Sequence, residues 1–499
     1  MEPQSGAQAL ADTARDIASG THMVETVANN LGLLAAAAIV FYVAAAVCSV
    51  REILKSRSSQ GSIAWLLSLF FIPYLTVPAY VIFGWRDFDD YARIRHKLGR
   101  DNRAERARKL DLTDEEETRT WQVLSSVAGL PFLAGNRCEL LINGEETFSS
   151  ILAGIESARH TILVQFFTIA DDEIGNQLAD RLIERAKAGV RVYLLYDDIG
   201  SSSLTRSYRK RLRAAGVQVS AFNARHKYLR ILGPMRLNYR NHRKVVVTDF
   251  EHAWVGGHNV SNDYLGRNDR FGAWRDTHVC VSGPAALACA LSFAEDWKWA
   301  HGGDISLALL TSIEKPGDEP VLVMPTGPAD ELEECAIAFV EAAARARKRL
   351  WISTPYFVPS LDIQTALYAA ALRGVDVRIL MPEKADHKIV WLASHSHGDD
   401  MLARGVRVFR YQAGFLHQKV VLVDDDLASI GTVNFDNRSF SINFEITLWF
   451  THARMIEKVA RMLENDFAHS RAVPPSALKS RSFAFRVVAT GAKLLSPVL

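Results

Sequence analysis

A motif that occurs twice constrains this chain more than any other feature. Residues 242–259 read HRKVVVTDFEHAWVGGHN, and residues 417–434 read HQKVVLVDDDLASIGTVN. Each copy places histidine, lysine and aspartate in the spacing H-x-K-x4-D, with a glycine and an asparagine at equal offsets behind them. The shared residues are His242, Lys244, Asp249, Gly256 and Asn259 in the first copy and His417, Lys419, Asp424, Gly431 and Asn434 in the second. Such self-similarity indicates an internal duplication, so we expect two lobes of one design.

A valine-rich run separates the lysine from the aspartate in both copies. Residues 245–247 and 420–423 are apolar and short, which predicts buried strands. Side chains two apart on a strand point to the same face, so the histidine and lysine of each motif can meet one anionic group. An imidazole and an ammonium together suit a phosphate.

The segments around the motifs predict alternating helices and strands. In the first half, we expect strands at residues 162–167 and 190–196 and helices at 148–157 and 174–188. The second half repeats this order, with strands at 350–353 and 375–381 and a helix at 363–372. A G-V-x-V strand precedes each histidine, at 216–219 and 405–408. The pattern predicts an α/β fold of two duplicated lobes, with mixed, mainly parallel sheets covered by helices. We expect the lobes to face each other about a pseudo-dyad, with one histidine from each.

Two uncharged stretches precede the lobes. Residues 31–50 are long enough to cross a bilayer, and so are residues 63–85, although Pro73 and Pro78 should kink the second stretch. A cleaved signal peptide is the alternative for the first stretch, but only Arg15 supplies positive charge ahead of it. We therefore predict a two-helix transmembrane hairpin.

Basic residues flank this hairpin unequally. Three lie in the loop between the two stretches, and six lie between residues 86 and 103. The excess after the second stretch favours a multi-pass membrane protein whose two lobes are cytoplasmic.

The whole chain divides into six predicted parts. These are a tail (1–25), the transmembrane hairpin (26–85), an exposed, charged helical linker near lipid headgroups (86–130), the first lobe (131–310), the second lobe (311–470) and a basic amphipathic C-terminal segment (471–499). With 499 residues and 48% hydrophobic content, the chain is long enough for several ordinary cores. Its net charge of +2 means that attraction to an anionic surface must come from local patches. Five irregularly spaced cysteines predict free thiols rather than disulfides or a zinc site.

Two segments mix basic and apolar residues. The first, at residues 225–236, is an insertion relative to the second lobe, and the other contains Lys479, Arg481, Phe483, Phe485, Arg486 and Lys493. Each is either a solvated loop or an element resting on an anionic bilayer.

With its two motifs, TPYFVPS at residues 354–360, NFEITL at 443–448 and the apolar stretches, the chain resembles the phospholipase D superfamily, and within it the bacterial cardiolipin synthases. The resemblance covers all but about the first 25 residues. It implies transfer of a phosphatidyl group from one phosphatidylglycerol to another, giving cardiolipin and glycerol through a phosphohistidine.

The resemblance also implies the site residues. The catalytic set is the six motif residues His242, Lys244, Asp249, His417, Lys419 and Asp424, of which the two aspartates are expected to be structural. Asn259 and Asn434 should donate hydrogen bonds to phosphate oxygens. Asp276 and Glu445 correspond to the carboxylates that orient the histidines, and we expect Asp276 to act on His242 and Glu445 to act on His417.

Phosphodiester exchange needs a nucleophile, a proton donor for the departing alkoxide, and cations to hold charge on phosphorus. Two histidines and two lysines meet that list without a cofactor. Following the family, His242 is the expected nucleophile and His417 the expected general acid. A metal-binding histidine cluster is the alternative, but a lysine in each motif would repel a divalent cation.

Other functions are compatible with the same motifs. A phospholipase D or another phosphatidyltransferase would use water or another alcohol as acceptor, and a nuclease of the superfamily would have no need of membrane spans. An inactive membrane scaffold is disfavoured because both motifs are intact. We expect phosphatidylglycerol and anionic membrane lipids as partners, integral membrane attachment and no nucleic acid.

Overall fold

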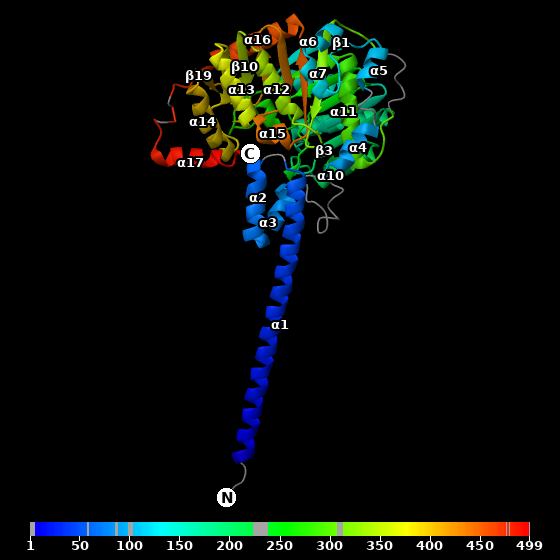
Figure 1. Cartoon of the computed structure of the whole chain (residues 1–499). Helices are drawn as coiled ribbons and strands as arrows, with labels where there is room; N and C mark the ends of the chain where they lie inside the picture. The colour runs from blue at the N-terminus through cyan, green and yellow to red at the C-terminus, as the bar shows by residue number, and fades with distance from the viewer. Residues whose placement is uncertain are drawn as a thin grey trace. The chain divides into compact units, whose positions relative to one another are not determined.

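A computed structural model describes residues 5–56, 59–84, 88–97, 103–222, 238–306, 313–475, 477–478 and 480–498. The chain separates into two compact units. The first is built mainly from residues 1–86, and the second contains both motif-bearing lobes in one body (Figure 1). The predicted insertion at residues 225–236 lies outside the described residues.

The first unit is a bundle of one long helix and shorter ones. Its elements are α1 (Ser5–Leu54), α2 (Ser59–Phe71), α3 (Pro73–Ala79) and the π-helix η1 (Tyr80–Gly84). Helix α1 begins at Ser5 and so includes most of residues 1–25, which we predicted to be a separate tail. The stretch Asn29–Leu54 within it has a mean hydropathy of 2.5 and is the one span long and apolar enough to cross a membrane among the described residues.

The second predicted span is not a continuous helix. The first break falls at Ile72, where the backbone leaves the helical region just before Pro73, and Pro78 then lies inside α3. A proline lacks the N–H that an interior helical position needs, which accounts for short segments here. The two-helix hairpin is therefore not confirmed. Tyr80 Oη and Ser62 Oγ both donate to the Glu52 carboxylate, at 2.9 and 2.6 Å, and so connect the short helices to α1.

The described part of the predicted linker holds four helices, and three of them contribute buried residues, contrary to the predicted exposure. They are α4 (Asp89–Lys97), α5 (Arg103–Lys109), α6 (Glu115–Thr120) and α7 (Gln122–Ala128). Tyr91 of α4 and Leu124 of α7 are fully buried in the core of the second unit. These helices therefore belong to the second unit.

The second unit is organised on one continuous sheet. Its strand order is β19-β13-β12-β10-β15-β16-β18-β9-β1-β8-β6-β5-β2-β3-β4. The first lobe contributes β1 (Leu133–Ile142), β2 (Thr161–Phe166), β3 (Arg191–Asp197), β4 (Gln218–Phe222), β5 (Val245–Thr248), β6 (His252–Gly256) and β8 (Thr277–Ser282). The second contributes β9 (Glu319–Thr326), β10 (Arg349–Ser353), β12 (Asp376–Pro382), β13 (Arg407–Tyr411), β15 (Val420–Val423), β16 (Leu427–Gly431), β18 (Glu445–Phe450) and β19 (Ser470–Ala472).

The strand order is palindromic about the pair β1–β9, apart from the edge strand β19. Counting outward from that antiparallel pair, the strands of the two lobes appear in corresponding order. The predicted duplication is thus present as two equivalent halves of one sheet.

Helices accompany the strands in the same order in both halves. In the first lobe they are α8 (Asn143–Ser157), α9 (Glu173–Lys187), α10 (Arg206–Ala214), the short η5 (Asn262–Leu265) and α11 (Pro284–His301). In the second they are α12 (Glu334–Arg345), α13 (Leu361–Leu372), α14 (Lys388–Leu402), α15 (Asn437–Ser441) and α16 (Ala453–Ala468), followed by α17 (Phe483–Lys493) and η6 (Ser496–Val498).

The prediction of mainly parallel sheets was wrong. Within the described residues, four of the fourteen neighbouring pairs in the main sheet are parallel: β2–β3, β3–β4, β10–β12 and β12–β13. The reason is local, because the strand after each motif lysine returns through a tight hairpin. Asp249 and Phe250 at the β5–β6 turn, and Asp424 at the β15–β16 turn, have positive φ, as such turns require.

The sheet is buried on both faces. Along β2, Ile162 and Val164 pack with α8, α9 and α10, whereas Leu163 between them joins the core that contains α11. This alternation is that of a strand covered by helices on each side. The five cysteines are free and buried, as predicted.

Candidate active site

His242 is held by a carboxylate from the other lobe. Its Nδ1 lies 2.9 Å from both carboxylate oxygens of Glu445, the first residue of β18. Thr432 Oγ1 and Asn443 Nδ2 also donate to that carboxylate, at 2.5 and 3.2 Å. With Nδ1–H donated to Glu445, the lone pair of His242 is on Nε2.

His417 has the equivalent arrangement. Its Nδ1 lies 2.7 Å from Oδ2 of Asp276, and the backbone N–H of Thr277 donates to Oδ1 of the same carboxylate at 2.8 Å. Both carboxylates are fully buried, so each has a fixed position behind its histidine.

The structure reverses the predicted pairing, since Glu445 contacts His242 and Asp276 contacts His417. The backbone explains why. His242 N donates to Phe444 O at 2.9 Å, and His417 N donates to Arg275 O at 2.8 Å, so each histidine backbone is bonded to the residue before the other lobe's carboxylate. The short strands β7 (Trp274–Arg275) and β14 (Phe415–Leu416) also pair across the lobes. The site is complete only when both lobes are present.

The motif lysines lie beside their histidines in the buried interior. Lys244 Nζ donates to His242 O at 2.7 Å, and Lys419 Nζ donates to His417 O and lies 3.2 Å from His417 Nε2. The two ammonium groups therefore line the region that the imidazoles enclose.

Burial sets the protonation of these groups. It lowers the pKa of His242 to about 4, despite the opposing charge of Glu445, and lowers the pKa of His417 to about 4 with help from the Lys419 charge. Burial also lowers the pKa of Lys419 to about 8 and that of Lys244 well below its usual value. Both imidazoles are consequently neutral at pH 7.

The orienting carboxylates remain ionised. Burial opposes this, but the hydrogen bond from His417 and the charge of Lys419 lower the pKa of Asp276. In the same way, His242, Lys244 and the Thr432 hydrogen bond outweigh burial and lower the pKa of Glu445.

The motif aspartates face away from the histidines. Asp249 accepts hydrogen bonds of 2.7–2.8 Å from the backbone N–H groups of Arg159, His160 and Thr161, just before β2. Asp424 accepts equivalent bonds of 2.7–2.8 Å from Arg347, Lys348 and Arg349, before β10. These contacts fit the structural role that we expected for both aspartates.

The two asparagines differ. Asn259 Oδ1 accepts from Thr168 N at 3.1 Å, and its Nδ2 donates to Tyr264 Oη at 2.5 Å. The side-chain oxygen of Asn434 is buried and without a partner among the described residues. The amide of Asn434 is therefore less restrained than that of Asn259.

Gly257 is required by the carboxylate beside it. A Cβ at this position would lie 2.0 Å from Asp276 Oδ1. Such contacts do not occur between real atoms, so the backbone comes this close only because the residue is glycine. Gly431 similarly leaves room for the Ile446 carbonyl oxygen, which would lie 2.4 Å from a Cβ on that residue.

The residue between the histidine and the lysine of each motif binds an acidic side chain on a helix. Arg243 pairs with Asp296 of α11 through its Nη1 at 2.9 Å, and Gln418 Nε2 donates to Asp466 of α16 at 2.7 Å. These acids occupy equivalent helices in the two lobes. Tyr91 from α4 also donates to Asp296, at 2.6 Å. Helix α4, which lies in the segment predicted as a linker, therefore supports the position of Arg243 next to His242.

Sequence reasoning missed the aromatic walls. The ring centroids of Tyr264 and Trp274 lie 5.5 and 5.3 Å from that of His417, and the Phe167 ring lies 5.1 Å from His242. It also missed Asp386, which accepts a hydrogen bond from Tyr356 Oη. Phe167, Tyr264, Trp274 and Asp386 all lie outside the two duplicated motifs. Only Tyr264 could have been suggested by its position, because it follows Asn259 within the next turn.

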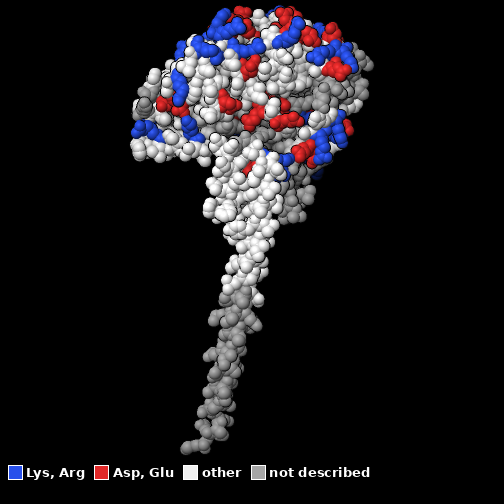
Figure 2. All heavy atoms as spheres, viewed as in Figure 1, with Lys and Arg blue, Asp and Glu red and all other residues white. Residues whose placement is uncertain are grey.

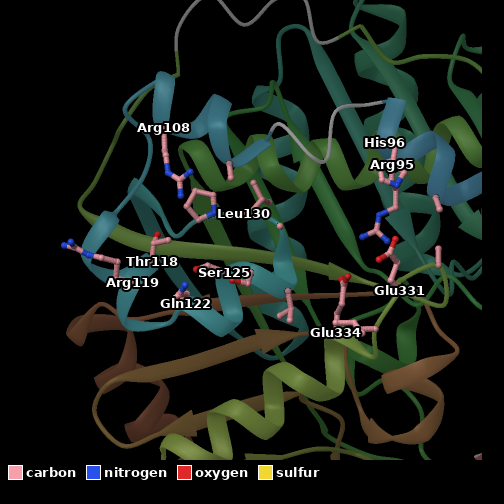
Figure 3. Close-up of a pocket in the computed structure, with 18 of the residues that line it drawn as sticks. Arg95, His96, Arg108, Thr118, Arg119, Gln122, Ser125, Leu130, Glu331 and Glu334 are labelled. Atoms are coloured by element: carbon pink, nitrogen blue, oxygen red, sulfur yellow. The ribbon is translucent and has the colours of Figure 1, made fainter. Parts of the chain in front are cut away.

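A separate cavity of about 840 Å³ lies among α4, α6, α7 and the loop before α12 (Figure 3). Basic side chains such as Arg108 and Arg119 and acidic ones such as Glu331 and Glu334 share its walls. The described residues that line it include neither motif histidine nor either motif lysine. The convergent histidines, rather than this cavity, are therefore the candidate active site.

Comparisons with known proteins agree with this site. The family model described as "Cardiolipin synthase, PLD-like domain" matches residues 151–281 and 339–469, and "Phospholipase_D-nuclease N-terminal" matches residues 40–85. Cardiolipin synthase A of Pseudomonas putida (strain GB-1) is 42% identical over 464 residues, covering 91% of this chain and 96% of that protein. Cardiolipin synthase A of Pseudomonas fluorescens (strain SBW25) is 42% identical over 462 residues, covering 90% and 95%.

A solved structure has a similar fold. The phosphatidylserine synthase of Haemophilus influenzae Rd KW20 aligns with a TM-score of 0.58 at 16% identity, covering 76% of this chain and 100% of that one. At this identity the likeness concerns the fold of the two lobes alone.

Proposed function

The chain belongs to the cardiolipin synthase family of the phospholipase D superfamily, and from this premise we propose that its two-histidine site joins two phosphatidylglycerol molecules into cardiolipin and releases glycerol. It is a phosphatidyltransferase. The observation that carries the chemistry is the crossed pair of histidine–carboxylate contacts, His242 with Glu445 and His417 with Asp276.

In the first half-reaction, His242 Nε2 forms a bond to phosphorus while the P–O bond to the headgroup glycerol breaks. The glycerol oxygen takes its proton from His417. Because burial favours neutral His417, the imidazole takes up this proton when the anionic phosphodiester binds beside it, and Asp276 stabilises the resulting imidazolium.

In the second half-reaction, His417 is neutral and removes a proton from a hydroxyl of the second phosphatidylglycerol. That oxygen bonds to phosphorus, and the bond to His242 Nε2 breaks. The enzyme returns to its starting state with no net change in protons or electrons.

Lys244 and Lys419 hold the negative charge that develops on the phosphoryl oxygens. Fixed charges in a buried site stabilise a transition state more strongly than they would in water. We assign Asn434 Nδ2 as a further donor to those oxygens, with Asn259 as its more restrained counterpart.

Membrane association follows from family membership and the apolar helix. We propose further that α1 spans the inner membrane, that residues 63–84 are embedded in it as short helices, and that the lobes are cytoplasmic. The basic residues at 86–103 support this orientation.

Labelled phosphatidylglycerol and the purified full chain test the function. Cardiolipin and glycerol in equal amounts are expected, with no product from the double variant His242→Ala and His417→Ala. Phosphatidic acid without cardiolipin would instead identify a hydrolase. Transfer to added alcohols but not to phosphatidylglycerol would identify another phosphatidyltransferase.

A further inference from the structure

The C-terminal helix α17 presents an apolar face that no described residue covers. Phe483, Val487, Val488, Leu494 and Leu495, in α17 and the two residues after it, are between 46% and 79% exposed. Two other side chains of the helix, Ala489 and Ala492, are buried. The helix thus has one face turned inward and another, larger and more apolar, turned to the outside.

The inward face is firmly attached to the lobe. Helix α17 packs along α14 (Figure 1), where the Phe485 ring lies 6.2 Å from Trp391 and 5.8 Å from His395. Lys493 pairs with Asp400 of α14, and Asn437 Nδ2 donates to Ser496 O at 2.8 Å. The exposed face is therefore presented by a fixed helix and is not a fraying terminus.

The chain segment that carries this face is basic. Residues 467–499 contain no acidic residue, whereas Arg471, Lys479, Arg481, Arg486 and Lys493 lie among them. Two of these cations have acidic partners from other elements, since Lys493 pairs with Asp400 and Arg471 with Glu383. Arg486 and Arg481 are exposed, and Lys479 lies outside the described residues. In Figure 2 the lower-left edge, where Figure 1 places α17, is largely uncharged with basic side chains beside it.

We propose that this face, defined by Phe483, Val487, Val488, Leu494 and Leu495, docks on the surface of an anionic bilayer and brings the catalytic lobes against the lipid. A helix with an apolar face bounded by basic side chains inserts its apolar groups at the headgroup boundary and pairs its cations with lipid phosphates. The proposal rests on the proposed function insofar as phosphatidylglycerol supplies the anionic headgroups.

A protein partner is the competing occupant. The exposed Arg481 and Arg486 beside the apolar side chains argue for lipid, because an apolar interface between proteins is depleted of charge at its core and needs no basic residues at its border. Lipid docking also explains why α17 is packed firmly against α14, since a fixed helix sets the distance between the active site and the bilayer.

Fluorescence quenching in the full chain tests the contact. The native cysteines are all buried, so Val487→Cys can be labelled selectively with an environment-sensitive dye, and Glu457→Cys on the exposed side of α16 provides a matched control. In vesicles of phosphatidylglycerol and phosphatidylethanolamine, lipids brominated on their acyl chains should quench the label at 487 at least threefold more than the label at 457. Replacing phosphatidylglycerol by phosphatidylcholine should reduce that difference.

Equal quenching at the two positions would overturn the proposal. So would a label at 487 that is shielded from water equally in detergent and in vesicles, because a protein partner gives that result. This readout does not depend on catalysis, so it stands even if the chain made no cardiolipin.

Turnover gives the second measurement. Val487→Asp should lower turnover of phosphatidylglycerol in vesicles at least tenfold and leave turnover in detergent micelles within twofold. A loss in micelles as large as that in vesicles would assign the face a role in folding instead and would refute the proposal.

Discussion

His242 and His417 have distinguishable tasks because different carboxylates hold them. If His242 is the nucleophile, Glu445→Gln impairs bond formation to phosphorus, and if His417 is the acid, Asp276→Asn impairs departure of the alcohol. Each substitution should lower turnover by about 10² to 10⁴, the usual contribution of positioned proton transfer. Either histidine-to-alanine change should abolish turnover of phosphatidylglycerol.

A donor with a good leaving group separates the two tasks. Phosphatidyl-p-nitrophenol releases a phenolate that needs no proton, so His417→Ala and Asp276→Asn should recover most of their first-step rate with it. His242→Ala and Glu445→Gln should not recover. Release of p-nitrophenol in the pre-steady state measures this, and rescue of the His242 pair instead would exchange the two roles.

Lys419 predicts an alkaline limit to activity. Its pKa, lowered to about 8 by burial, means that its ammonium is charged below that pH and becomes neutral above it. Since the charge is needed on the phosphoryl oxygens, kcat/KM in micelles should fall by about tenfold per pH unit above pH 8.

Lys419→Arg is the informative variant for this limit. A guanidinium stays charged throughout the accessible range, so any remaining activity should lose its alkaline decline, whatever its absolute rate. A profile that is flat to pH 10 in the parent protein, or an unchanged decline in the arginine variant, would contradict the assignment.

At the level of elements, the hairpin formed within each motif explains why the two motifs share the spacing from lysine to aspartate. It also explains why the strand directions were predicted wrongly. The valine runs, the helices and the repeated strand order could be predicted because they depend on local periodicity. The direction of β5 and β6 could not, since it depends on Asp249 adopting a positive φ at the turn. The carboxylates Asp276 and Glu445 were identified, but their partners depend on backbone pairing between lobes, for which one sequence holds no signal.

Asp249 is predicted to contribute to stability rather than to chemistry. Its carboxylate accepts three backbone hydrogen bonds, and Asp249→Ala leaves those donors without their acceptor, at a cost of about 2–4 kcal/mol in unfolding free energy. Asp249→Asn should cost less, because the amide keeps one acceptor and asparagine tolerates positive φ. Denaturant unfolding measures both, and folded Asp249→Asn protein should retain kcat within about threefold.

Gly257→Ala tests the close approach between β6 and the Asp276 carboxylate. The added methyl would occupy the position of Asp276 Oδ1, so we expect the carboxylate to shift and turnover to fall by at least about tenfold. The matched control is Gly398→Ala in α14, where a Cβ meets Met381 at an ordinary 3.7 Å and should stabilise the helix. Equal turnover of the two variants in micelles would show that the Asp276 carboxylate can accommodate the added methyl group without loss of function.

At the scale of the whole molecule, we expect the unit that carries the two histidines and the unit that carries the apolar helix α1 to be separable in function. The lobes share one continuous sheet and exchange backbone hydrogen bonds at both histidines, so the site requires both lobes but no residue of α1. The second apolar stretch could not be predicted well, since its length satisfied the rule for a span while Pro73 and Pro78 divided it into short helices.

Removing residues 1–86 should therefore leave the rate of the chemical steps unchanged and reduce the access of the enzyme to substrate in a bilayer. In detergent micelles, turnover should remain within about threefold. On vesicles it should fall at least about tenfold, because the span that we propose for α1 is lost and only the proposed, reversible contact of α17 remains. That residual vesicle activity should also fall steeply between low and physiological salt, since attraction between basic side chains and anionic lipid is screened, while the full chain should be nearly insensitive. Adding Val487→Asp to the truncated protein should remove the salt-dependent activity. Vesicle turnover that matches the full chain at all salt concentrations would show that α1 has no part in delivering the substrate.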